Sequence, residues 1–447
     1  MSCLLGAGVL LLAVASEGQF VTQVAAGYQH SLFLERGGSL WVMGENNYGE
    51  LGDGTDNQTN LPEQIVATNV TAMAGGQYHS LFVKSDGSLW TVGFNYYGQL
   101  GDGVFNPIAP FYGTNQPQEI LTSGVTAVAA GADHSLFTKS DGSLWAMGSN
   151  LHGELGDGVY NNVTPFGTNQ PQHVVTTNTV TAIAAGNLYS LFVKGDGSLW
   201  GMGDNGSGQL GNGTSGNTTN RPVFVTNGVT AVAVGYQHSL FLKSDGSLWG
   251  MGYNHYGQLG DGTFNNSTNV PEMIVPSNVT AIAGGQYHTL FLKSDGSLWA
   301  MGYNGLGQLG DGTINNTNRP EMIVSNNVVA IAAGQNHSLF VKRDGGLWGM
   351  GYNGEGQLGV GTNIMQTASP VPIVVNPIAI QLLISGGVRL TYAGLTGTNY
   401  ALDRSFNLAP INWVPQTTNP AGAAGNVVFT NTPNPATNNF WRIRSVP

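Results

Sequence analysis

Residues 285–313 read GQYHTLFLKSDGSLWAMGYNGLGQLGDGT, and this stretch decides the fold. An apolar run at 290–292 is followed by a Ser-Asp-Gly-Ser segment and by a second apolar run around Trp299. Two short strand-forming runs separated by a glycine-containing turn predict a β-hairpin. The hairpin tryptophan recurs at intervals of 49 to 55 residues, at Trp41, Trp90, Trp145, Trp200, Trp249, Trp299 and Trp348. A repeat of this length with several strands per copy is typical of a β-propeller.

Each copy of the repeat predicts four strands. A run of small and β-branched residues, such as 279–283, precedes the hairpin, and a loop and a further short strand follow it. A proline is expected to introduce this last strand, where its missing N–H removes no ladder hydrogen bond. These prolines are Pro62, Pro117, Pro171, Pro222, Pro271, Pro320 and Pro370. We therefore predict an all-β fold in which residues 20–375 form a seven-bladed β-propeller of four-stranded blades.

The expected packing follows from this arrangement, because each sheet buries one face on the preceding blade and the other on the next. The seven tryptophans are expected to pack between blades, so that replacing one by Ala costs about 3–5 kcal/mol. The strand at 21–24 precedes the first hairpin, and no matching strand follows Pro370. This N-terminal strand could therefore complete the last blade and close the ring.

The first 19 residues have the features of a leader. An apolar run from Leu4 to Ala15 ends in small residues, which is the length of a signal-peptide core and too short to span a bilayer. No Lys or Arg precedes the run, and the alternative is a strand or helix of the folded protein. Removal of a leader would remove Cys3, so the mature chain would have no cysteine and no membrane span.

Residues 376–447 differ in composition from the repeats. They are rich in Asn, Thr and Pro, lack lysine, and contain short alternating runs such as 388–392 and 440–443. This pattern predicts a small β-sandwich-like module. Through the segment at Trp413 and the terminal FWRIR it resembles the C-terminal β modules of secreted bacterial proteins, which implies surface attachment, sorting or capping of the propeller.

The charge of the chain argues against nucleic acid as a partner. The net charge is −11, and residues 1–375 carry 24 acidic against 10 basic residues. An acidic surface without a basic cluster repels phosphate backbones.

The repeated pattern G-x-x-H-S-L-x-L-K-x-D-G-x-L-W-x-M-G-x-N-x-x-G-Q-L-G-D-G-T resembles the repeat of the regulator of chromosome condensation family, a seven-bladed propeller. The first copy matches it at Gly27, His30, Trp41, Gly44, Asn46, Gly49, Leu51 and Gly52. The resemblance implies the fold over about residues 20–375. For function it implies nucleotide exchange on a small GTPase, as in eukaryotic members, or a binding task.

The recurring polar residues are interpreted as structural. A catalytic base or metal ligand is needed once, whereas a histidine is found in six copies and Tyr189 in the seventh, so we expect hydrogen-bonding roles. The histidines are His30, His79, His134, His238, His288 and His337. The aspartates of the Ser-Asp-Gly and L-G-D-G-T segments are expected to form turns, since no copy has calcium-loop spacing and Asn212 and Val360 replace the acid in two copies. We predict no catalytic residue, metal or cofactor.

Differences between the copies point to a binding site. Copies two and three carry longer links before the proline, and these links contain aromatic side chains that add contact area at small entropic cost. The candidate partner-binding residues are Phe105, Phe111, Tyr112, Tyr160 and Phe166. The alternative is that these loops pack on each other and cap the two blades.

Three functions remain from the sequence. The first is an extracytoplasmic scaffold, secreted or in the cell envelope and monomeric, that recognises a protein or glycan through propeller-face loops; propeller-type inhibitors of β-lactamases are a secreted use of this repeat. The second is a guanine-nucleotide exchange factor, against which stand the lack of an inserted hairpin and of a basic tail. The third is a propeller enzyme such as a lactonase or lyase, for which no unique His, Asp and Glu constellation is found.

Overall fold

The structure is a computed structural model. It describes residues 20–106, 113–164, 166–175, 179–264, 267–361 and 364–373, together with six strands between residues 379 and 446. The leader at 1–19 and the segment at Trp413 lie outside the described residues. No helix within the described ranges is long and apolar enough to cross a membrane.

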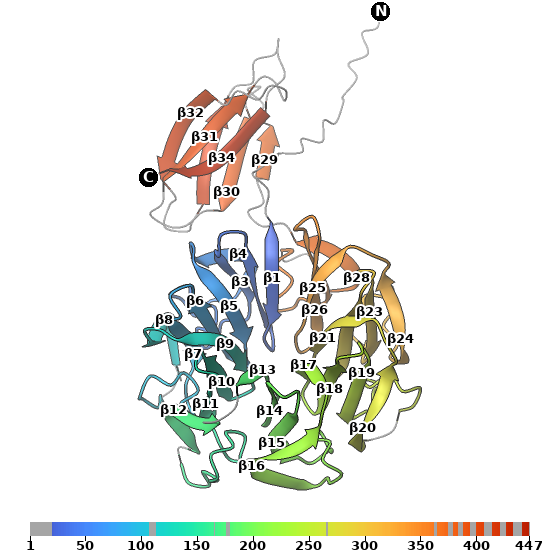
Figure 1. The fold of residues 1–447 in the computed structure, drawn as a ribbon. Helices are drawn as coiled ribbons and strands as arrows, with labels where there is room; N and C mark the ends of the chain where they lie inside the picture. Colours follow the sequence, from blue (N-terminus) through green and yellow to red (C-terminus); the bar gives the residue numbers. More distant parts are fainter. Residues whose placement is uncertain are drawn as a thin grey trace, which may run out of the picture. The chain divides into compact units, whose positions relative to one another are not determined.

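Residues 20–373 form one unit, a ring of seven antiparallel sheets of four strands each (Figure 1). The prediction of an all-β, seven-bladed propeller of four-stranded blades is confirmed. The first and second strands of the blades are β1 (Val21–Ala26) and β2 (His30–Glu35), β5 (Val70–Gly75) and β6 (His79–Lys84), β9 (Val125–Ala130) and β10 (His134–Lys139), β13 (Val180–Ala185) and β14 (Tyr189–Lys194), β17 (Val229–Val234) and β18 (His238–Lys243), β21 (Val279–Gly284) and β22 (His288–Lys293), and β25 (Val328–Ala333) and β26 (His337–Lys342). The third and fourth strands are β3 (Leu40–Gly44) and β4 (Thr59–Val66), β7 (Leu89–Phe94) and β8 (Gly113–Leu121), β11 (Leu144–Ser149) and β12 (Gly167–Val175), β15 (Leu199–Asn205) and β16 (Asn217–Thr226), β19 (Leu248–Tyr253) and β20 (Ser267–Val275), β23 (Leu298–Gly302) and β24 (Thr317–Val324), and β27 (Leu347–Tyr352) and β28 (Gln366–Ile373).

The antiparallel strand order gives the ring two different faces. The turn between the first and second strands and the loop between the third and fourth strands lie at the same end of each blade, and we call this end the loop face. In the first blade it comprises residues 27–29 and 45–58. The hairpin turns and the links between blades lie at the other end, the hairpin face, which comprises 36–39 and 67–69 in the first blade.

The ring closes without exchange of a strand. β1 pairs with β2, with Val24 opposite Phe33, and so belongs to the first blade, while β25 to β28 complete the seventh. The prediction that the N-terminal strand could complete the last blade is therefore wrong. Each blade is one contiguous segment, and closure relies on contacts between blades, such as the hydrogen bond from Gln335 N–H to the Tyr28 carbonyl at 3.0 Å.

The repeated prolines lie inside the outer strands and do not introduce them. β4 begins at Thr59, three residues before Pro62, and the register with β3 shifts between the pairs Val42–Glu63 and Gly44–Thr59. The proline thus lies in a bulge of an edge strand, a position that tolerates the missing N–H. The bulge turns a backbone carbonyl towards the neighbouring blade: the carbonyl of Asn115 accepts the N–H of Gly54 at 2.9 Å, and that of Asn60 accepts the N–H of Gly361 across the seam of the ring.

Both faces of every sheet are apolar, which explains the unbroken hydrophobic runs. In the sixth blade, Leu290, Leu292 and Leu298 pack against Phe340 and Met350 of the seventh. The second-strand phenylalanines are almost completely buried, whereas the tryptophans other than Trp41 retain partial exposure. The tryptophans do pack at the interfaces, as expected, but at their outer margin and not at their centre.

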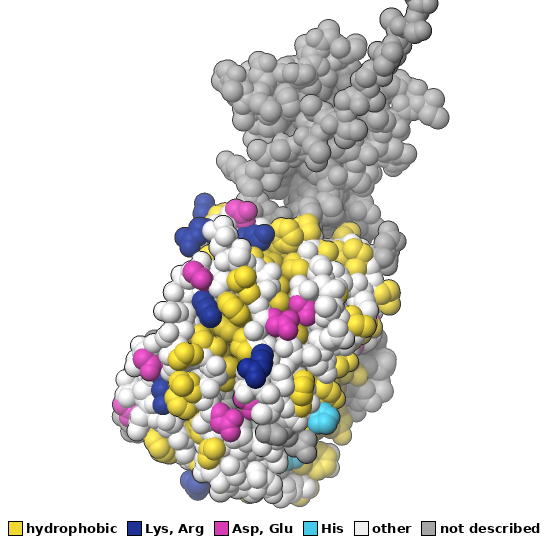
Figure 2. Space-filling view, turned by 90° about the vertical axis from the view of Figure 1, so that its right-hand side faces the viewer, with side chains coloured by type: hydrophobic (Ala, Val, Ile, Leu, Met, Phe, Trp, Pro, Cys, Tyr) yellow, Lys and Arg dark blue, Asp and Glu magenta, His cyan; other side chains and the backbone are white. Residues whose placement is uncertain are grey.

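Six of the seven tryptophans have a lysine ammonium stacked on the ring at this margin, whereas the Trp41 Nε1–H donates to Glu35 Oε2 at 3.2 Å. Trp299 lies parallel to Phe291, its Nε1–H donates to Ser297 Oγ at 2.8 Å, and the Lys293 ammonium stacks on its ring at 4.0 Å. Figure 2, which views the side bearing the outer strands β20 and β24, shows hydrophobic side chains distributed among polar ones on this outer surface.

A ring of buried hydrogen bonds connects neighbouring blades at mid-radius. His30 Nε2 lies 2.9 Å from Ser80 Oγ of the second blade, and the Ser80 hydroxyl donates to the Glu50 carbonyl of the first blade at 2.8 Å. Because the serine proton is used in this way, the serine oxygen accepts from His30 and the imidazole carries its proton on Nε2. The remaining links join His79 to Ser135, His134 to Ser190, His238 to Thr289, His288 to Ser338 and His337 to Ser31.

Blade four keeps the connection with a different side chain. The Tyr189 hydroxyl donates to the His238 carbonyl at 2.6 Å, so the phenol replaces the imidazole as the link to the next blade. A glycine three residues before each histidine makes room for the ring: a Cβ on Gly27 would lie 2.2 Å from Cε1 of His30. The G-x-x-H segment is thus a packing requirement of the interface.

The second unit contains six described strands in two three-stranded antiparallel sheets. One sheet has the order β29 (Ala379–Leu382), β30 (Val388–Ala393), β33 (Asn426–Asn431), and the other has the order β32 (Val414–Pro420), β31 (Asn399–Ser405), β34 (Phe440–Val446). The expected strands at 388–392, 399–402 and 440–443 are present.

We expect the propeller to unfold in acid because of its buried histidines. Burial lowers the pKa of His30 to about 4 and that of the other five to about 3, against about 6.5 when unfolded. The free energy of unfolding is therefore highest above pH 6.5, where these histidines are neutral in both states. It falls as the pH drops towards 3, by about 1.4 kcal/mol per pH unit for each histidine. Denaturant midpoints measured from pH 7.5 to 4 should fall steeply, and less steeply in His288→Tyr, which copies Tyr189. His255→Gln, at an exposed position, is the control; an unchanged slope in His288→Tyr would contradict the assignment.

A second prediction compares Phe291→Ala with Trp299→Ala. Phe291 has no exposed surface and packs against leucines of blade five, so its truncation leaves a cavity between blades five and six and should cost about 3–5 kcal/mol. Trp299 is partly exposed, and its loss should cost clearly less, contrary to the expectation from sequence. Urea denaturation of both variants checks the order, and an equal or larger loss in Trp299→Ala would refute it.

Candidate functional site

The loop face carries the positions that differ most between otherwise similar blades. They are the two residues between glycine and histidine in G-x-x-H and the three undefined residues in M-G-x-N-x-x-G, which in the first blade are 28, 29, 45, 47 and 48. We call these the variable positions. Across the seven blades they include no Lys or Arg and 11 of the 16 tyrosines of the chain. These tyrosines are Tyr28, Tyr48, Tyr78, Tyr96, Tyr97, Tyr236, Tyr253, Tyr256, Tyr287, Tyr303 and Tyr352.

A buried asparagine in each blade shapes the loop that carries three of these positions. Asn46 has no exposed surface; its Oδ1 accepts the N–H of Leu51 at 2.9 Å, and its Nδ2 donates to the Thr55 carbonyl at 3.0 Å. Asp53 accepts the N–H of Thr55 at 2.8 Å, so the carboxylate of the L-G-D-G-T segment closes a turn. The loop backbone is therefore held by invariant groups, and the variable side chains project from it.

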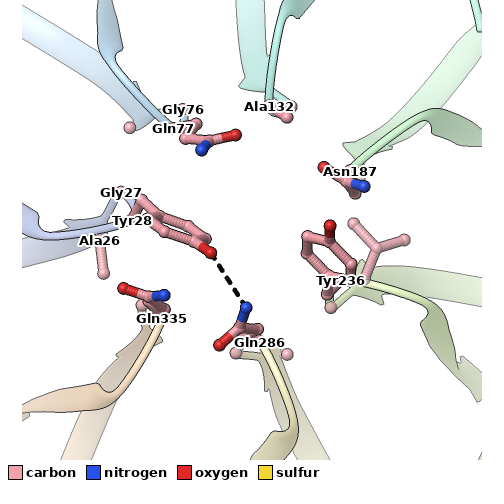
Figure 3. A pocket seen from close by; sticks show the side chains of 18 of the residues that line it. Ala26, Gly27, Tyr28, Gly76, Gln77, Ala132, Asn187, Tyr236, Gln286 and Gln335 are labelled. Carbon is pink, nitrogen blue, oxygen red and sulfur yellow. Dashed lines mark hydrogen bonds between the residues drawn. The ribbon is translucent and has the colours of Figure 1, made fainter. Parts of the chain in front are cut away.

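The seven side chains that follow the G-x-x-H glycine surround a central opening (Figure 3). They are Tyr28, Gln77, Ala132, Asn187, Tyr236, Gln286 and Gln335. Tyr28 reaches across the opening, where its hydroxyl accepts a hydrogen bond from Gln286 Nε2 at 3.0 Å. The cavity has a volume of about 100 Å³, and no acid, base or histidine is among its lining residues. The described lining offers hydrogen bonds and aromatic surface, and its ionisable side chains are the phenols of Tyr28 and Tyr236.

Two groups of aromatic rings lie on the loop face beside this opening. The first tyrosine cluster spans blades one and two and consists of Tyr28, Tyr48, Tyr78, Phe94 and Tyr97. The ring centroids of Tyr48 lie 4.9 Å from those of both Tyr78 and Phe94, and Tyr28 and Tyr78 meet edge to face at 6.3 Å. All five rings are partly buried, so they form one packed aromatic surface.

The second tyrosine cluster spans blades five and six and consists of Tyr236, Tyr253, Tyr256, Tyr287 and Tyr303. The Tyr256 centroid lies 5.0 Å from Tyr287 and 5.1 Å from Tyr303, and Tyr236 lies 5.8 Å from Tyr287. Burial, followed by the neighbouring phenols, raises the pKa of Tyr287 to about 12. The phenol therefore keeps its proton at neutral pH and can donate a hydrogen bond to a ligand.

Carboxyl groups of blades one and three flank the first cluster, whereas the variable positions of blades five and six contain none. Glu45 and Glu50 lie in blade one, and Asp133 and Glu154 lie in blade three. Burial raises the pKa of Glu50 to about 8, and burial and the nearby Glu154 raise that of Asp133 to about 7. The pKa of Tyr78 is raised, mainly by burial and further by both Glu45 and Asp133. Tyr78 thus lies between acidic groups of blades one and three.

The candidate aromatic residues from the sequence lie in the long loops of blades two and three. Phe105 and Phe166 are partly buried, and Phe166 adopts a positive φ of 63°. The Tyr160 hydroxyl donates to the Thr218 carbonyl of blade four at 3.3 Å, so this side chain contacts the next blade. Phe111 and Tyr112 lie outside the described residues. The structure does not bring Phe105, Tyr160 and Phe166 into a common ring contact within its described part, and their binding role stays a prediction.

Sequence reasoning missed the two tyrosine clusters. Their signal was present, because the variable positions are the undefined places of the repeat pattern itself. Differences in link length between the copies are conspicuous in the sequence. The structure shows that residue changes at unchanged spacing, which are less conspicuous, gather on one face.

The comparisons with known proteins agree with the observed fold. The model of the RCC1-like domain matches residues 113–401, more than half of the chain. The chain belongs to the RCC1-like domain family. The regulator of chromosome condensation repeat also matches at 37–83 and 86–138, and a second model of this repeat matches at 21–50 and 70–99.

Curated relatives of this RCC1-like propeller are much longer proteins. The human probable E3 ubiquitin-protein ligase HERC4 is 27% identical over 201 residues, which are 44% of this chain and 18% of the ligase. The human E3 ubiquitin-protein ligase HERC2 is 28% identical over 211 residues, 46% of this chain and 4% of the ligase. The chain thus spans less than a fifth of these relatives.

Solved structures share the fold of this RCC1-like propeller. Human WBSCR16 superposes with a TM-score of 0.67 at 23% identity, covering 76% of this chain and 95% of that one. Yeast RCC1 (Prp20), solved bound to Kap60, superposes with a TM-score of 0.66 at 21% identity over 80% of this chain and 85% of that one. At these identities the likeness shows the fold alone.

The internal repeat predicts the behaviour of Glu50→Gln. Glu50 has no exposed surface, its Oε1 has no partner among the described residues, and five other blades have Gln at this position. Because its folded pKa of about 8 exceeds the unfolded value of about 4.5, the wild type loses stability as the pH rises from 4.5 to 8. Glu50→Gln should therefore raise the melting temperature by a few degrees at pH 9 and leave it unchanged at pH 4.5. Gln308→Glu is the converse control; equal melting temperatures at pH 9 would refute the assignment.

Proposed function

We propose that this chain is a binding scaffold without catalytic activity, which recognises a protein or glycan partner through the loop face of the propeller. The observation that carries the proposal is the gathering of eleven tyrosines at the variable positions of that face. A fold requirement would place the same residue in every blade, as it does for the histidines, whereas these positions change from blade to blade.

The chemistry of the loop face supports recognition. Tyrosine offers a large, rigid and amphipathic contact surface at low entropic cost and is enriched in the cores of interfaces. The central opening adds amides from Gln77, Asn187 and Gln335 beside these rings. Rings and amides together satisfy the polar and apolar parts of a partner surface without a charged pocket.

The known relatives and the lining of the central opening bear on the two alternative functions, nucleotide exchange and enzymatic catalysis. Yeast RCC1 has been solved in complex with Kap60 and studied for its binding to Gsp1p and histones, which is consistent with partner binding by such propellers. Nucleotide exchange has no support in this chain beyond the shared fold. The described lining of the central opening contains no carboxylate, histidine or lysine, which disfavours a lactonase or lyase.

The proposal includes the location of the protein. We infer export to the cell envelope or medium and a monomeric state, from the apolar run at 4–15 and the low content of cysteine. The six strands of the second unit are proposed to form a β-sandwich-like module for attachment or sorting. Fractionation of the native cell with an antibody against the propeller tests export, and recovery of the protein only in the cytoplasm would overturn this part.

The binding role is tested with Tyr78→Gln and Tyr287→Gln in one chain. Both residues are partly buried on the loop face, and Gln occupies the equivalent positions 29 and 237, so the variant should keep its melting temperature within a few degrees. Ligands of the wild type are identified by cross-linking to native secreted proteins and by a glycan array. We expect the variant to capture these ligands at least tenfold more weakly than the wild type does.

The matched control for this test lies on the hairpin face. Lys84→Ala with Lys243→Ala removes two side chains that stack on tryptophans without altering the loop face. Loss of the same ligands in both variants, or in neither, would overturn the proposed role of the loop face.

A further inference from the structure

The two tyrosine clusters differ in one respect that the repeat makes directly comparable. Where the first cluster has Glu45 and Glu50, the equivalent positions in blades five and six have tyrosine and glutamine: Tyr253 and Tyr303, Gln258 and Gln308. Where it has Asp133, blade seven has Asn336 after the second cluster. The aromatic surfaces are similar, but blades five and six have no carboxyl group at the positions equivalent to Glu45 and Glu50.

Two of these carboxyl groups have buried oxygens without a hydrogen-bond partner among the described residues. They are Glu45 Oε2 and Glu50 Oε1, although Glu45 is 9% exposed and Glu50 is fully buried. Blade four shows how the site is satisfied elsewhere, because Gln209 Nε2 donates to Asp204 Oδ2 at 2.7 Å. Asp204 and Gln209 are the equivalents of Glu45 and Glu50, so in blade one an acceptor has replaced the donor. This pair therefore needs a proton or a cation from outside.

The lysines of the propeller lie away from this surface. The six lysines described in the propeller end the second strands, and each ammonium stacks on a tryptophan towards the hairpin face. Two arginines lie beside loop-face glycines of other blades, Arg221 at Gly158 and Arg319 at Gly262. The variable positions contain no Lys or Arg, and within the described residues no basic side chain bonds to Glu45, Glu50 or Asp133, whereas the nearby His152 favours the ionised form of Glu154. The first cluster is thus an aromatic surface with uncompensated acidic groups on both sides.

We propose that the first tyrosine cluster binds a basic segment of a partner polypeptide, with an arginine or lysine side chain lying on the rings between Glu45–Glu50 and Asp133. This inference rests on the proposed binding function of the loop face and names the chemistry of the partner. The face of a tyrosine ring attracts a cation, and the guanidinium group combines this stacking with up to five hydrogen-bond donors. The unsatisfied oxygens of Glu45 and Glu50 are buried, so these carboxyl groups attract a cation on the rings electrostatically and not through a direct hydrogen bond.

The position of Tyr78 favours such a cation over other ligands. It contacts Tyr28 and Tyr48, and it lies within electrostatic reach of Glu45 on one side and Asp133 on the other. An anionic ligand would be repelled from both sides, and a neutral sugar would gain nothing from the acidic groups. The second cluster, which has rings and amides but lacks these acids, is the better surface for a neutral ligand.

The binding of a cation would be linked to protons. In the free protein Glu50 and Asp133 hold a proton part of the time near neutral pH, because burial and the acids facing them, Glu45 and Asp56 for Glu50 and Glu154 for Asp133, raise both pKa values. A docked cation favours the ionised carboxylates, so binding releases protons and should strengthen as the pH rises from 6 to 8. Ordinary long-range attraction to exposed acids would change little over this range.

The test uses the full chain and a fluorescein-labelled octa-arginine peptide as the probe, with octaglutamine as the neutral comparison. We expect saturable binding of octa-arginine that is weakened about tenfold in Glu50→Gln with Asp133→Asn. Both replacements occur at equivalent positions of other blades, at Gln99 and Asn336, so the variant should fold, which its melting temperature verifies. Tyr78→Gln should weaken the probe similarly, and the wild-type affinity should be higher at pH 8 than at pH 6.

The matched control is Asp86→Asn with Asp141→Asn, which removes the same charge from the hairpin turns of blades two and three. We expect this variant to stay within about twofold of the wild type at 0.15 M salt. Equal weakening in the two double variants, or the absence of saturable binding to the wild type, would overturn the inference. A third outcome separates this inference from the proposed function. If the loop-face tyrosine variants lose native ligands but Glu50→Gln with Asp133→Asn binds octa-arginine as tightly as the wild type, the binding role of the loop face stands and the basic partner is wrong.

Discussion

Each sheet of this protein has two apolar faces, and neither can be exposed to water without a large cost. Leucines of one blade and the phenylalanine and methionine of the next meet in a buried layer, as Leu290 meets Phe340, and this burial requires a neighbour on both sides of every blade. A ring is the arrangement that provides it for all seven. The stability of a single blade is therefore inseparable from that of its neighbours.

Polar contacts connect neighbouring blades at three distances from the axis of the ring. Near the axis, the backbone of Gln335 bonds to that of Tyr28; at mid-radius, the histidines bond to hydroxyls of the next blade; at the rim, the glycine of each L-G-D-G segment bonds to the bulge of the next outer strand. These contacts use invariant residues of the repeat or, near the axis, only backbone groups. Because the invariant residues hold the backbone, the variable positions of the loop face are released from a structural role and can carry recognition.

The sequence predicted the number of blades and strands because the repeat is long, regular and rich in strand-forming residues. It did not predict how the ring closes, since pairing of β1 with β2 and strand exchange with blade seven give the same strand count. Pro62 was placed at a strand start because bulges leave no mark in an apolar pattern. Tyr28 and Tyr78 escaped notice because strand periodicity cannot show that turns from different blades converge around one axis.

Each blade is a single contiguous stretch of chain, with no strand shared across the seam between β28 and β1. The interface between blades seven and one resembles the other six interfaces, except that no peptide link connects its two blades. The chain could therefore be circularly permuted at any link between blades without dividing a sheet. A duplicated or deleted segment of about fifty residues would change the number of blades while leaving every remaining sheet whole, which offers a physical route by which such rings gain or lose members.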